Sequence, residues 1–509
     1  MSQPADIILT NGKVFTLSQT VWASAVAIRD GRFVYVGSDD EVEDYIGPNT
    51  EQIDLEGRTV IPGLIDSHVH LLYYGRNKLL RADLNGCKSI KEIIQRLQAH
   101  DEKRRGEWIL GWGFDQEILA ERRFPTRHDL DQFNKPVLIS RLCGHACVVN
   151  SKAIELVGPE KIPDSARDTG LLTEDDMNPV WEAMPQPTFK EMVEAAEFAA
   201  AKALATGLTS VHCLVSSQTE LDAVRHINRQ SQLPIRFYVQ PGYEMLDSLL
   251  AEGLKTGDGD EMLRMGAIKI FADGSMGART AALKEDFADD PGNNGILLHS
   301  DEELTDMVRK VHNSGWQVAI HAIGDRAVEQ AVNAIETVLI ETGEDNRTRR
   351  HRIEHASLLN EDLVFRMADL HILASVQPQF IITDFWTINR VGRERYRWAY
   401  PFRTMLEAGI PLSLGSDCPV ENLDVFELIC RAVTRDEHSQ SERLTVEETI
   451  ALYSLGGAYA MFQEANLGSI EVGKLADFIV LNQDIFSIPE SEIPNCKVET
   501  VFVGGKRKI

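Results

Sequence analysis

The chain has little cysteine and no long apolar run. Its seven cysteines include no pair with zinc-ribbon spacing, and Cys143 and Cys147 do not form a redox Cys-x-x-Cys motif. We therefore expect free thiols in a reducing compartment. No apolar stretch reaches the roughly 18 residues of a membrane span, and the N-terminus lacks the pattern of a signal peptide. These absences favour a cytoplasmic protein.

Basic runs and phosphate-binding loops are missing as well. The 509 residues carry 52 Lys and Arg against 78 Asp and Glu, and no basic patch of the kind that binds nucleic acid is visible. No Gly-x-x-x-x-Gly-Lys-Ser/Thr pattern occurs. The excess acidic charge indicates solubility rather than a substrate. We expect a small-molecule substrate, no nucleic-acid or membrane partner, and a homodimer as the default assembly.

Strand-like and helical patterns alternate through the middle of the chain. Helical patterns include residues 301–314, 326–341 and 360–370. The candidate strands are residues 63–66, 209–213, 235–240, 267–272, 317–321, 352–355, 372–377 and 411–415. This alternation predicts an α/β fold, a (β/α)8 barrel over residues 61–467, with a doubly wound open sheet as the alternative. We favour the barrel because ionisable residues recur at the strand ends, which converge only in a barrel.

The two ends of the chain share a different sequence pattern, in which short strand-like runs alternate with turn residues. Asn11-Gly12 predicts a hairpin turn after residues 7–10, and Asp30-Gly31 marks a second turn. Residues 476–481 and 498–503 read as strands too. Neither end has enough apolar surface to fold alone. We therefore predict one composite β-sandwich domain from residues 1–60 and 468–509.

About 140 residues separate the first barrel strand from the second. Residues 107–112 and 136–140 within them read as extra strands, and a connection of this length must carry its own structure. We predict an inserted lobe at about residues 80–200 that covers the barrel mouth and shapes the substrate pocket.

The most informative motif is Asp66-Ser67-His68-Val69-His70, which closes an apolar run. Because side chains alternate along a strand, His68 and His70 project from one face at its C-terminal end. Two imidazoles at this spacing can hold one metal ion, although a single His-x-His motif is a weak signal.

Four later strand-like runs also end in ionisable residues: Lys269, His321, His355 and Asp417. Each has an ordinary interpretation alone, as a lysine that reaches solvent or pairs with Asp273, a hydrogen-bonded histidine, or an N-cap aspartate. Metal chemistry at a barrel mouth accounts for all of them together. Lys269 has two functional interpretations: a neutral amine that adds CO2 to become a bridging carbamate, or an unmodified amine that binds substrate.

Taken together, these motifs resemble the metal-dependent amidohydrolase superfamily, in its N-substituted formamide deformylase-like (YtcJ-like, amidohydrolase family 3) branch. The resemblance covers essentially the whole chain. It rests on residues 60–70, 269–275, 321–325, 354–355, 415–417 and 468–478.

The resemblance implies a role for each motif residue. His68 and His70 would bind a first zinc ion, His321 and His355 a second, carboxylated Lys269 would bridge them, and Asp417 would complete the first site. The implied activity is hydrolysis of a non-peptide C–N bond in an amide, formamide or cyclic amide. A metal-bridged hydroxide would attack, with Asp417 as general base and then general acid.

Pocket residues are harder to predict. The Gly144-His145 and Asn150-Ser151 run is similar to one in this branch, and it makes His145 a candidate for stabilising the oxyanion. The substrate-binding candidates are Tyr74, Trp112, Arg279 and Trp386, the arginine for a substrate anion and the aromatics for apolar walls. Tyr73 and Phe380 are further wall candidates, and ordinary packing is the competing interpretation for every aromatic.

Two other functions stay open. A mononuclear, deaminase-like aminohydrolase would keep Lys269 unmodified and bind about one metal ion per chain. A non-catalytic scaffold would be free to lose ligands, whereas all six positions here hold competent residues.

Overall fold

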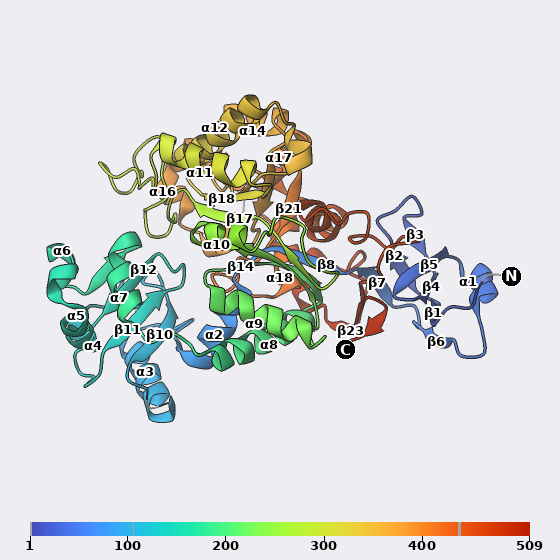
Figure 1. Cartoon of the computed structure of the whole chain (residues 1–509), viewed down its shortest axis with the longest axis horizontal. Helices are drawn as coiled ribbons and strands as arrows, with labels where there is room; N and C mark the ends of the chain where they lie inside the picture. Colours follow the sequence, from blue (N-terminus) through green and yellow to red (C-terminus); the bar gives the residue numbers. More distant parts are fainter. Residues whose placement is uncertain (1–2, 105, 436–438) are drawn as a thin grey trace.

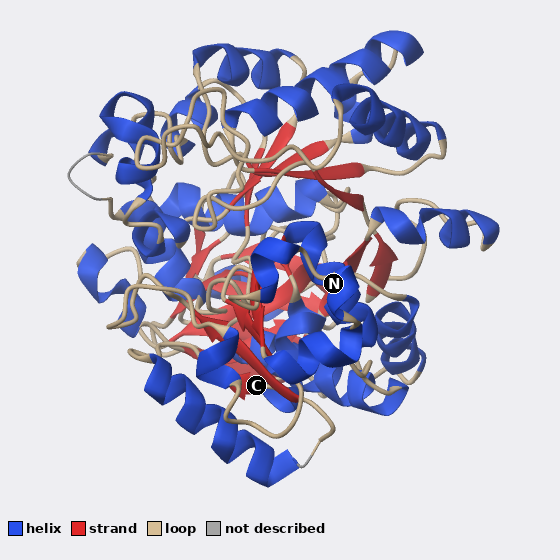
Figure 2. Cartoon of the chain, turned by 90° about the vertical axis from the view of Figure 1, so that its left-hand side faces the viewer, coloured by secondary structure: helices blue, strands red, loops and turns tan. Residues whose placement is uncertain are grey.

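The structure, a computed structural model, describes residues 3–104, 106–435 and 439–509. It is an α/β fold, as predicted, in which helices surround the central strands (Figures 1 and 2). Within the described ranges, no helix has the length and apolar character needed to cross a membrane.

Two parallel sheets form the centre of the molecule. One has the strand order β16-β15-β14-β8 and the other β17-β18-β19-β20-β21. The strands are β8 (Leu64–Val69), β14 (Leu208–Val215), β15 (Arg236–Pro241), β16 (Leu263–Met265), β17 (Ile268–Phe271), β18 (Val318–Ala322), β19 (Arg352–His355), β20 (Leu373–Val376) and β21 (Leu412–Leu414). All eight predicted strands are confirmed; β19 has the predicted ends, and the ends of the others shift by one to three residues.

Contacts join the two sheets at both edges. Only Gly266 and Ala267 separate β16 from β17, and a parallel bridge pairs Gly242, after β15, with Lys269. At the other edge, the amide of Asp417, after β21, donates a 2.8 Å hydrogen bond to the His68 carbonyl in β8. The C-terminal end of β15 thereby lies beside β17, and that of β21 beside β8.

Amphipathic helices cover the outer faces of these strands. In α11 (Asp301–Asn313) the buried residues Leu304, Val308 and Val311 recur at helical spacing, and Ser300 and Glu303 form a capping box. The predicted helices are confirmed as α11, α12 (Asp325–Thr342) and α14 (Glu361–Asp369). The other helices beside the sheets include α2 (Leu71–Leu80), α8 (Phe189–Ala205), α9 (Gln218–Arg229), α10 (Leu246–Ala251), α17 (Phe402–Glu407) and α18 (Val425–Val433).

Strands from both ends of the chain share one sheet. Its order is β24-β23-β22-β7-β2-β3, in which β22 runs antiparallel to β7. A second sheet, β5-β4-β1-β6, shares a buried apolar cluster with it. The strands are β1 (Ile7–Thr10), β2 (Lys13–Phe15), β3 (Trp22–Ala23), β4 (Ala25–Arg29), β5 (Arg32–Gly37), β6 (Glu51–Asp54), β7 (Thr59–Pro62), β22 (Phe478–Leu481), β23 (Val498–Val503) and β24 (Lys506–Arg507).

One turn prediction is wrong. The Asp30-Gly31 turn does join β4 to β5, but Asn11-Gly12 does not form a hairpin, because β1 pairs with β4 and β6 while β2 pairs with β3 and β7. The chain instead crosses from one sheet to the other at this point. Each strand gains two other partners in its own sheet, and this pairing outweighs the local turn preference.

Deleting residues 476–509 should unfold this part of the molecule. The deletion removes β22, the antiparallel partner of β7, together with the buried rings of Phe478 and Phe502. We expect a large loss of soluble protein and of cooperative urea unfolding. Deleting only residues 506–509, which include the exposed edge strand β24, is the control and should be tolerated. A soluble, cooperatively folded product of the long deletion would contradict the prediction.

The segment between β8 and β14 carries its own sheet, as predicted. Its order is β13-β12-β11-β10-β9, with two apolar clusters beside it. We call its part from β9 to α7, residues 82–183, the inserted lobe (Figure 1). It contains β9 (Ala82–Asp83), α3 (Ile90–Arg104), β10 (Ile109–Phe114), α4 (Arg127–Leu130), β11 (Val137–Arg141), β12 (Ala146–Val149), α5 (Ser151–Val157), α6 (Asp164–Arg167), β13 (Leu171–Thr173) and α7 (Asn178–Ala183).

Candidate active site

Five histidine rings form a continuous row at the strand ends. The ring centroids of His70 and His68 lie 5.5 Å apart, those of His68 and His355 4.9 Å, and those of His355 and His321 4.5 Å. His145, from the inserted lobe, follows at 5.6 Å from His321. The fold therefore brings together histidines from three central strands and the lobe.

Asp417 lies against the start of this row. Its Oδ1 atom is 3.3 Å from the Nε2 atoms of both His68 and His70. One ligand atom from each of these three residues falls within 4.8 Å of the other two, close enough to share an ion. Two of the three are almost completely buried, which is unusual for a group of ionisable residues without a partner.

The Lys269 amine is buried close enough to Asp417 and Glu354 for their charges to act on it. It is 2% exposed, and its Nζ atom has no hydrogen-bond partner among the described residues, although it lies 4.8 Å from the Phe271 ring. His68 Nε2 and Asp417 Oδ1 are buried without a hydrogen bond too. Buried polar atoms cost free energy unless they are satisfied, so these three atoms together fit a site that binds an ion.

The protonation states suit metal binding. Burial lowers the pKa of Lys269 to about 8 and that of His355 to about 3, and it holds the pKa of His321 well below its usual value. Burial would raise the pKa of Asp417, but the neighbouring His68 and His70 outweigh it and hold this pKa well below its usual value. At neutral pH, Asp417 is thus a carboxylate, while His321 and His355 are neutral imidazoles, the ligand form of histidine.

Hydrogen bonds orient these rings. His355 donates from Nδ1 to the Gln377 side-chain oxygen at 2.8 Å, and His321 donates from Nε2 to the Gly274 carbonyl at 2.9 Å. Because each acceptor fixes the proton on one ring nitrogen, the other nitrogen keeps its lone pair.

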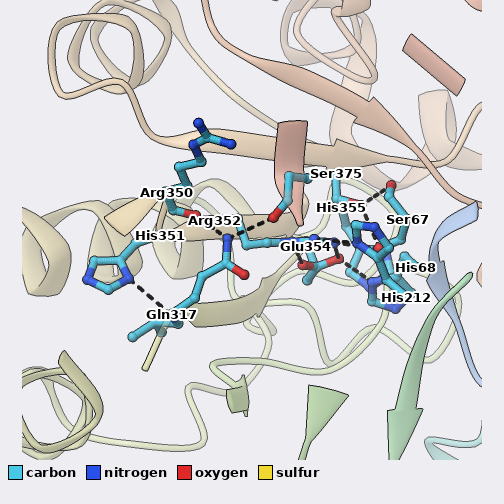
Figure 3. A network of polar contacts seen from close by, with 12 residues as sticks. Ser67, His68, His212, Gln317, Arg350, His351, Arg352, Glu354, His355 and Ser375 are labelled. Carbon is cyan, nitrogen blue, oxygen red and sulfur yellow. Dashed lines mark hydrogen bonds and ion pairs between the residues drawn. The ribbon is translucent and has the colours of Figure 1, made fainter. Parts of the chain in front are cut away.

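A buried charge network holds His68 (Figure 3). Its Nδ1 atom donates to Glu354, which also accepts a 2.5 Å hydrogen bond from Arg352 Nε. Arg352 contacts His212 Nδ1 at 2.9 Å, and all four side chains are completely buried. Burial would raise the pKa of Glu354, but Arg352 and His68 outweigh it and hold this pKa well below its usual value. Glu354 is therefore a carboxylate that turns His68 Nε2 toward Asp417.

Replacing Glu354 with glutamine should weaken this arrangement in two ways. The Arg352 guanidinium would lose its buried counterion, at a cost of about 3–5 kcal/mol of unfolding free energy. Zinc affinity should fall about 10–100-fold because His68 loses its orienting acceptor. Urea unfolding and zinc titration measure the two effects. The control is Glu336→Gln, which breaks a partly exposed pair with Arg366 and should cost about 1 kcal/mol or less. Equal costs for both variants would contradict the prediction.

The backbone is strained at two of the strand ends. His355 and Asp417 have φ values of 73° and 55°, in the left-handed region that non-glycine residues rarely occupy. Such strain persists where the surrounding structure over-determines it and is concentrated at functional sites.

A cavity opens above the row of histidines. Its lining residues from the central strands and the loops after them include His321, His355, Asp417 and Glu421. The inserted lobe contributes Asp115, Arg141, Cys143 and His145. The lobe therefore shapes the pocket, as predicted. His145 Nδ1 lies 2.9 Å from Glu174. Burial opposes a charged His145, but Glu174 outweighs it and raises the pKa of His145 to about 9.

The four predicted substrate-binding residues have different positions. Trp386 lines the cavity, as does Phe380. Tyr74, Trp112 and Arg279 are not among its lining residues in the described part of the chain. Tyr74 stacks near Phe198, Trp112 is 2% exposed within β10, and Arg279 pairs with Asp289 at 2.9 Å.

Several site residues were not predicted from the sequence. Glu354 and Gln377 orient ligand-type histidines, and Arg141 and Glu421 line the cavity. The Arg352-x-Glu354 spacing was an available signal, because it places two opposite charges on one face of a buried strand. The lobe residues gave no such signal.

The site can be compared with known proteins. A model of the amidohydrolase family matches residues 51–508. The chain belongs to this amidohydrolase family. YtcJ of Bacillus subtilis (strain 168) is 34% identical over 95% of this chain and 95% of its own. The N-substituted formamide deformylase of Arthrobacter pascens is 27% identical over 99% of this chain and 98% of its own.

A solved structure agrees with this membership. An uncharacterized metal-dependent hydrolase from Pyrococcus horikoshii OT3 has 33% sequence identity and a TM-score of 0.80, over 95% of this chain and 99% of its own. As a member of the amidohydrolase family, the chain is a metal-dependent hydrolase that acts on carbon–nitrogen bonds.

Proposed function

We propose that this amidohydrolase cleaves a non-peptide amide-type bond of a small molecule at a site with two divalent metal ions. The observation that carries the proposal is the convergence of the histidine row, the orphaned Lys269 amine and the Asp417 carboxylate beneath one cavity. Zinc suits this set of nitrogen and oxygen donors.

The side chains fit such a centre. His68, His70 and Asp417 would hold one ion, His321 and His355 the other, and Lys269 would bridge them as a carbamate. For this, the neutral Lys269 amine forms an N–C bond to CO2 while one C–O π bond of CO2 breaks. The nitrogen then releases one proton, and the resulting carbamate carries a single negative charge that its two oxygens share. When bound, the ions would act as Lewis acids toward water and the substrate carbonyl.

Asp417 transfers the protons of the reaction, and His145 stabilises the developing charge. Asp417 takes a proton from the attacking water as the C–O bond forms, and returns it to the leaving nitrogen as the C–N bond breaks. His145, protonated at neutral pH through its contact with Glu174, stabilises the negative charge that develops on the carbonyl oxygen.

N-substituted formamides are the first substrates to screen. The support is the similarity to the N-substituted formamide deformylase of Arthrobacter pascens, which matches almost the full length of this chain. Other N-acyl amines and cyclic amides follow, because the same proton transfers cleave them.

A mononuclear aminohydrolase is the second candidate. The observation that favours it is that only His68, His70 and Asp417 form a ligand cluster within 4.8 Å among the described residues. In that enzyme Lys269 would stay an amine, and a deaminase-type substrate would be attacked at a ring carbon.

Metal content and intact mass distinguish the two candidates. The protein is purified without chelator, its metals are counted per chain, and its mass is measured under non-denaturing conditions. Two ions and about 44 Da of extra mass, one CO2, support the binuclear site. One ion without the adduct supports the mononuclear site. No metal after reconstitution with zinc and bicarbonate would overturn both candidates and favour a non-catalytic scaffold.

Reactivation of the metal-free protein should depend on pH. Below its pKa of about 8, Lys269 is protonated and cannot attack CO2, so the reactive fraction falls about tenfold for each further pH unit. We therefore expect reactivation by zinc and CO2 to be about tenfold slower at pH 6.5 than at pH 7.5. Dissolved CO2, rather than total bicarbonate, is kept constant. A rate that does not change with pH would argue against carboxylation of Lys269.

We also propose a domain division. The two central sheets would form one closed (β/α)8 barrel within residues 61–467, supported by the contacts at both sheet edges. Residues 1–60 and 468–509 would form the β-sandwich domain, supported by the pairing of β7 with β22. The inserted lobe, at about residues 80–200, would belong to the hydrolase domain.

A further inference from the structure

A second cavity lies between α2 and the inserted lobe, and it shares no lining residue with the candidate active site. Its volume is about 180 Å³, several times the roughly 30 Å³ that one water molecule occupies in the liquid. Two arginines line it, Arg76 in the middle of α2 and Arg81 directly after this helix.

Arg81 is a buried cation in the wall of this cavity. It is 7% exposed, and its guanidinium donates a long hydrogen bond of 3.4 Å to Tyr73 Oη. Among the described residues, no ion pair joins Arg81 to a carboxylate. Burial lowers its pKa, as does the neighbouring Arg76. A buried, unpaired charge is costly, and proteins retain one mainly where a ligand compensates it.

Arg76 adds a second, partly satisfied guanidinium. It lies 4.8 Å from the Tyr73 ring, whose centre is 5.5 Å from the Arg81 guanidinium. Its Nε atom is buried without a hydrogen bond, and its nearest carboxylate, Glu220, is 4.0 Å away. Glu220 therefore offsets part of the charge of Arg76, whereas no carboxylate of the described residues forms an ion pair with Arg81.

The remaining walls are largely apolar. They include Leu80, Trp108, Leu110, Met184, Pro185 and Pro187. Two acidic residues line the cavity as well. Glu191 accepts hydrogen bonds from Thr188 at the start of α8, and Glu107 is exposed to solvent. Neither forms an ion pair with Arg81.

We propose that this cavity binds an organic carboxylate, with its oxygens at Arg81 and Arg76 and its apolar body against the surrounding walls. Arginine binds carboxylates bidentately, and two guanidiniums around one aromatic ring offer several such geometries. This site is independent of the proposed hydrolysis, because it uses none of the residues assigned to it.

The test is calorimetric titration of the full chain with octanoate. We expect one saturable site, with affinity reduced about tenfold or more by Arg81→Gln, since a charge-assisted hydrogen bond is lost. The matched control is Arg229→Gln, which removes the same charge from an exposed position in α9 and should leave the affinity unchanged. Octanamide, which has the same body without the charge, should bind much more weakly.

Two further measurements separate this site from alternatives. The His68→Ala, His70→Ala variant should bind octanoate normally, because the candidate metal site is not involved. Without ligand, Arg81→Met should be at least as stable to urea as the wild type, because it removes an uncompensated charge. If Arg81→Gln does not fold, Arg76→Gln applies the same binding test.

Several outcomes would overturn the proposal. One is the absence of saturable binding at millimolar octanoate. Another is an octanoate affinity of Arg81→Gln and Arg76→Gln that equals that of the wild type. A third is loss of octanoate binding in the His68→Ala, His70→Ala variant. A large loss of stability in Arg81→Met would make this arginine structural. Binding of inorganic phosphate in preference to octanoate would identify a small-anion site instead.

Discussion

Asp417→Asn should lower kcat by about a thousandfold or more while the fold is retained. Asparagine has the same shape but cannot take a proton from water or return it to the leaving nitrogen, and general acid–base catalysis contributes roughly 10²–10⁴-fold. Loss of a charged ligand adds to this effect. Steady-state kinetics on the screened substrate, with zinc content measured in parallel, separate lost catalysis from lost metal.

Glu421→Gln is the matched control. Glu421 lines the same cavity four residues after Asp417, and burial raises its pKa to about 8. It is therefore largely protonated at pH 7, and glutamine resembles the protonated acid. We expect less than about a tenfold change in kcat. If Asp417→Asn keeps wild-type kcat with normal metal content, Asp417 is not the proton carrier.

Lys269→Met should abolish the second metal ion and lower kcat by about a thousandfold or more. Methionine fills the space of the lysine stem but cannot form a carbamate, so the bridge between the two proposed sites is lost. Elemental analysis should show at most one ion per chain, and intact mass should show no CO2 adduct. Two retained ions would remove Lys269 from the proposed centre.

The same variant should stabilise the metal-free protein. Burial lowers the pKa of Lys269 from 10.5 to about 8. At pH 7, where this amine is charged in both states, the shift lowers the free energy of unfolding by about 3 kcal/mol. Since the unfolded state binds the proton more tightly, this penalty disappears as pH rises from about 8 to 10.5. Lys284→Met, which breaks a pair with Glu329 at the surface, is the control and should change stability little. A metal-free Lys269→Met protein that is less stable than the wild type would contradict this account.

Local pattern was a good guide to the central fold and to the ligand-type residues. The eight strands and three helices were predictable because alternation and helical spacing report which face of an element is buried. His68, Lys269, His321, His355 and Asp417 could be singled out because each lies in or just after a strand-like run. The C-terminal ends of neighbouring parallel strands lie close together. In the structure His68 lies beside His355 and Asp417, His355 lies beside His321, and the charge of Asp417 acts on Lys269.

Local pattern failed where distant partners compete. Asn11-Gly12 has a strong preference for a hairpin turn, but β1 and β2 gain more by pairing in separate sheets. The partners β4, β6 and β7 are remote from the motif itself, so the motif could not reveal them.

The sequence by itself determined the α/β class, the strand ends that carry ionisable residues, and the family, because these depend on residue type and spacing. Only the tertiary structure decided which groups have partners. It showed that Glu354 orients His68. Within the described residues, it also showed that the Lys269 amine has no hydrogen-bond partner and that Arg81 is buried without an ion pair to a carboxylate. The physical reason is that desolvation and pairing depend on what surrounds a charge in space, and these surroundings come from segments far apart in the chain.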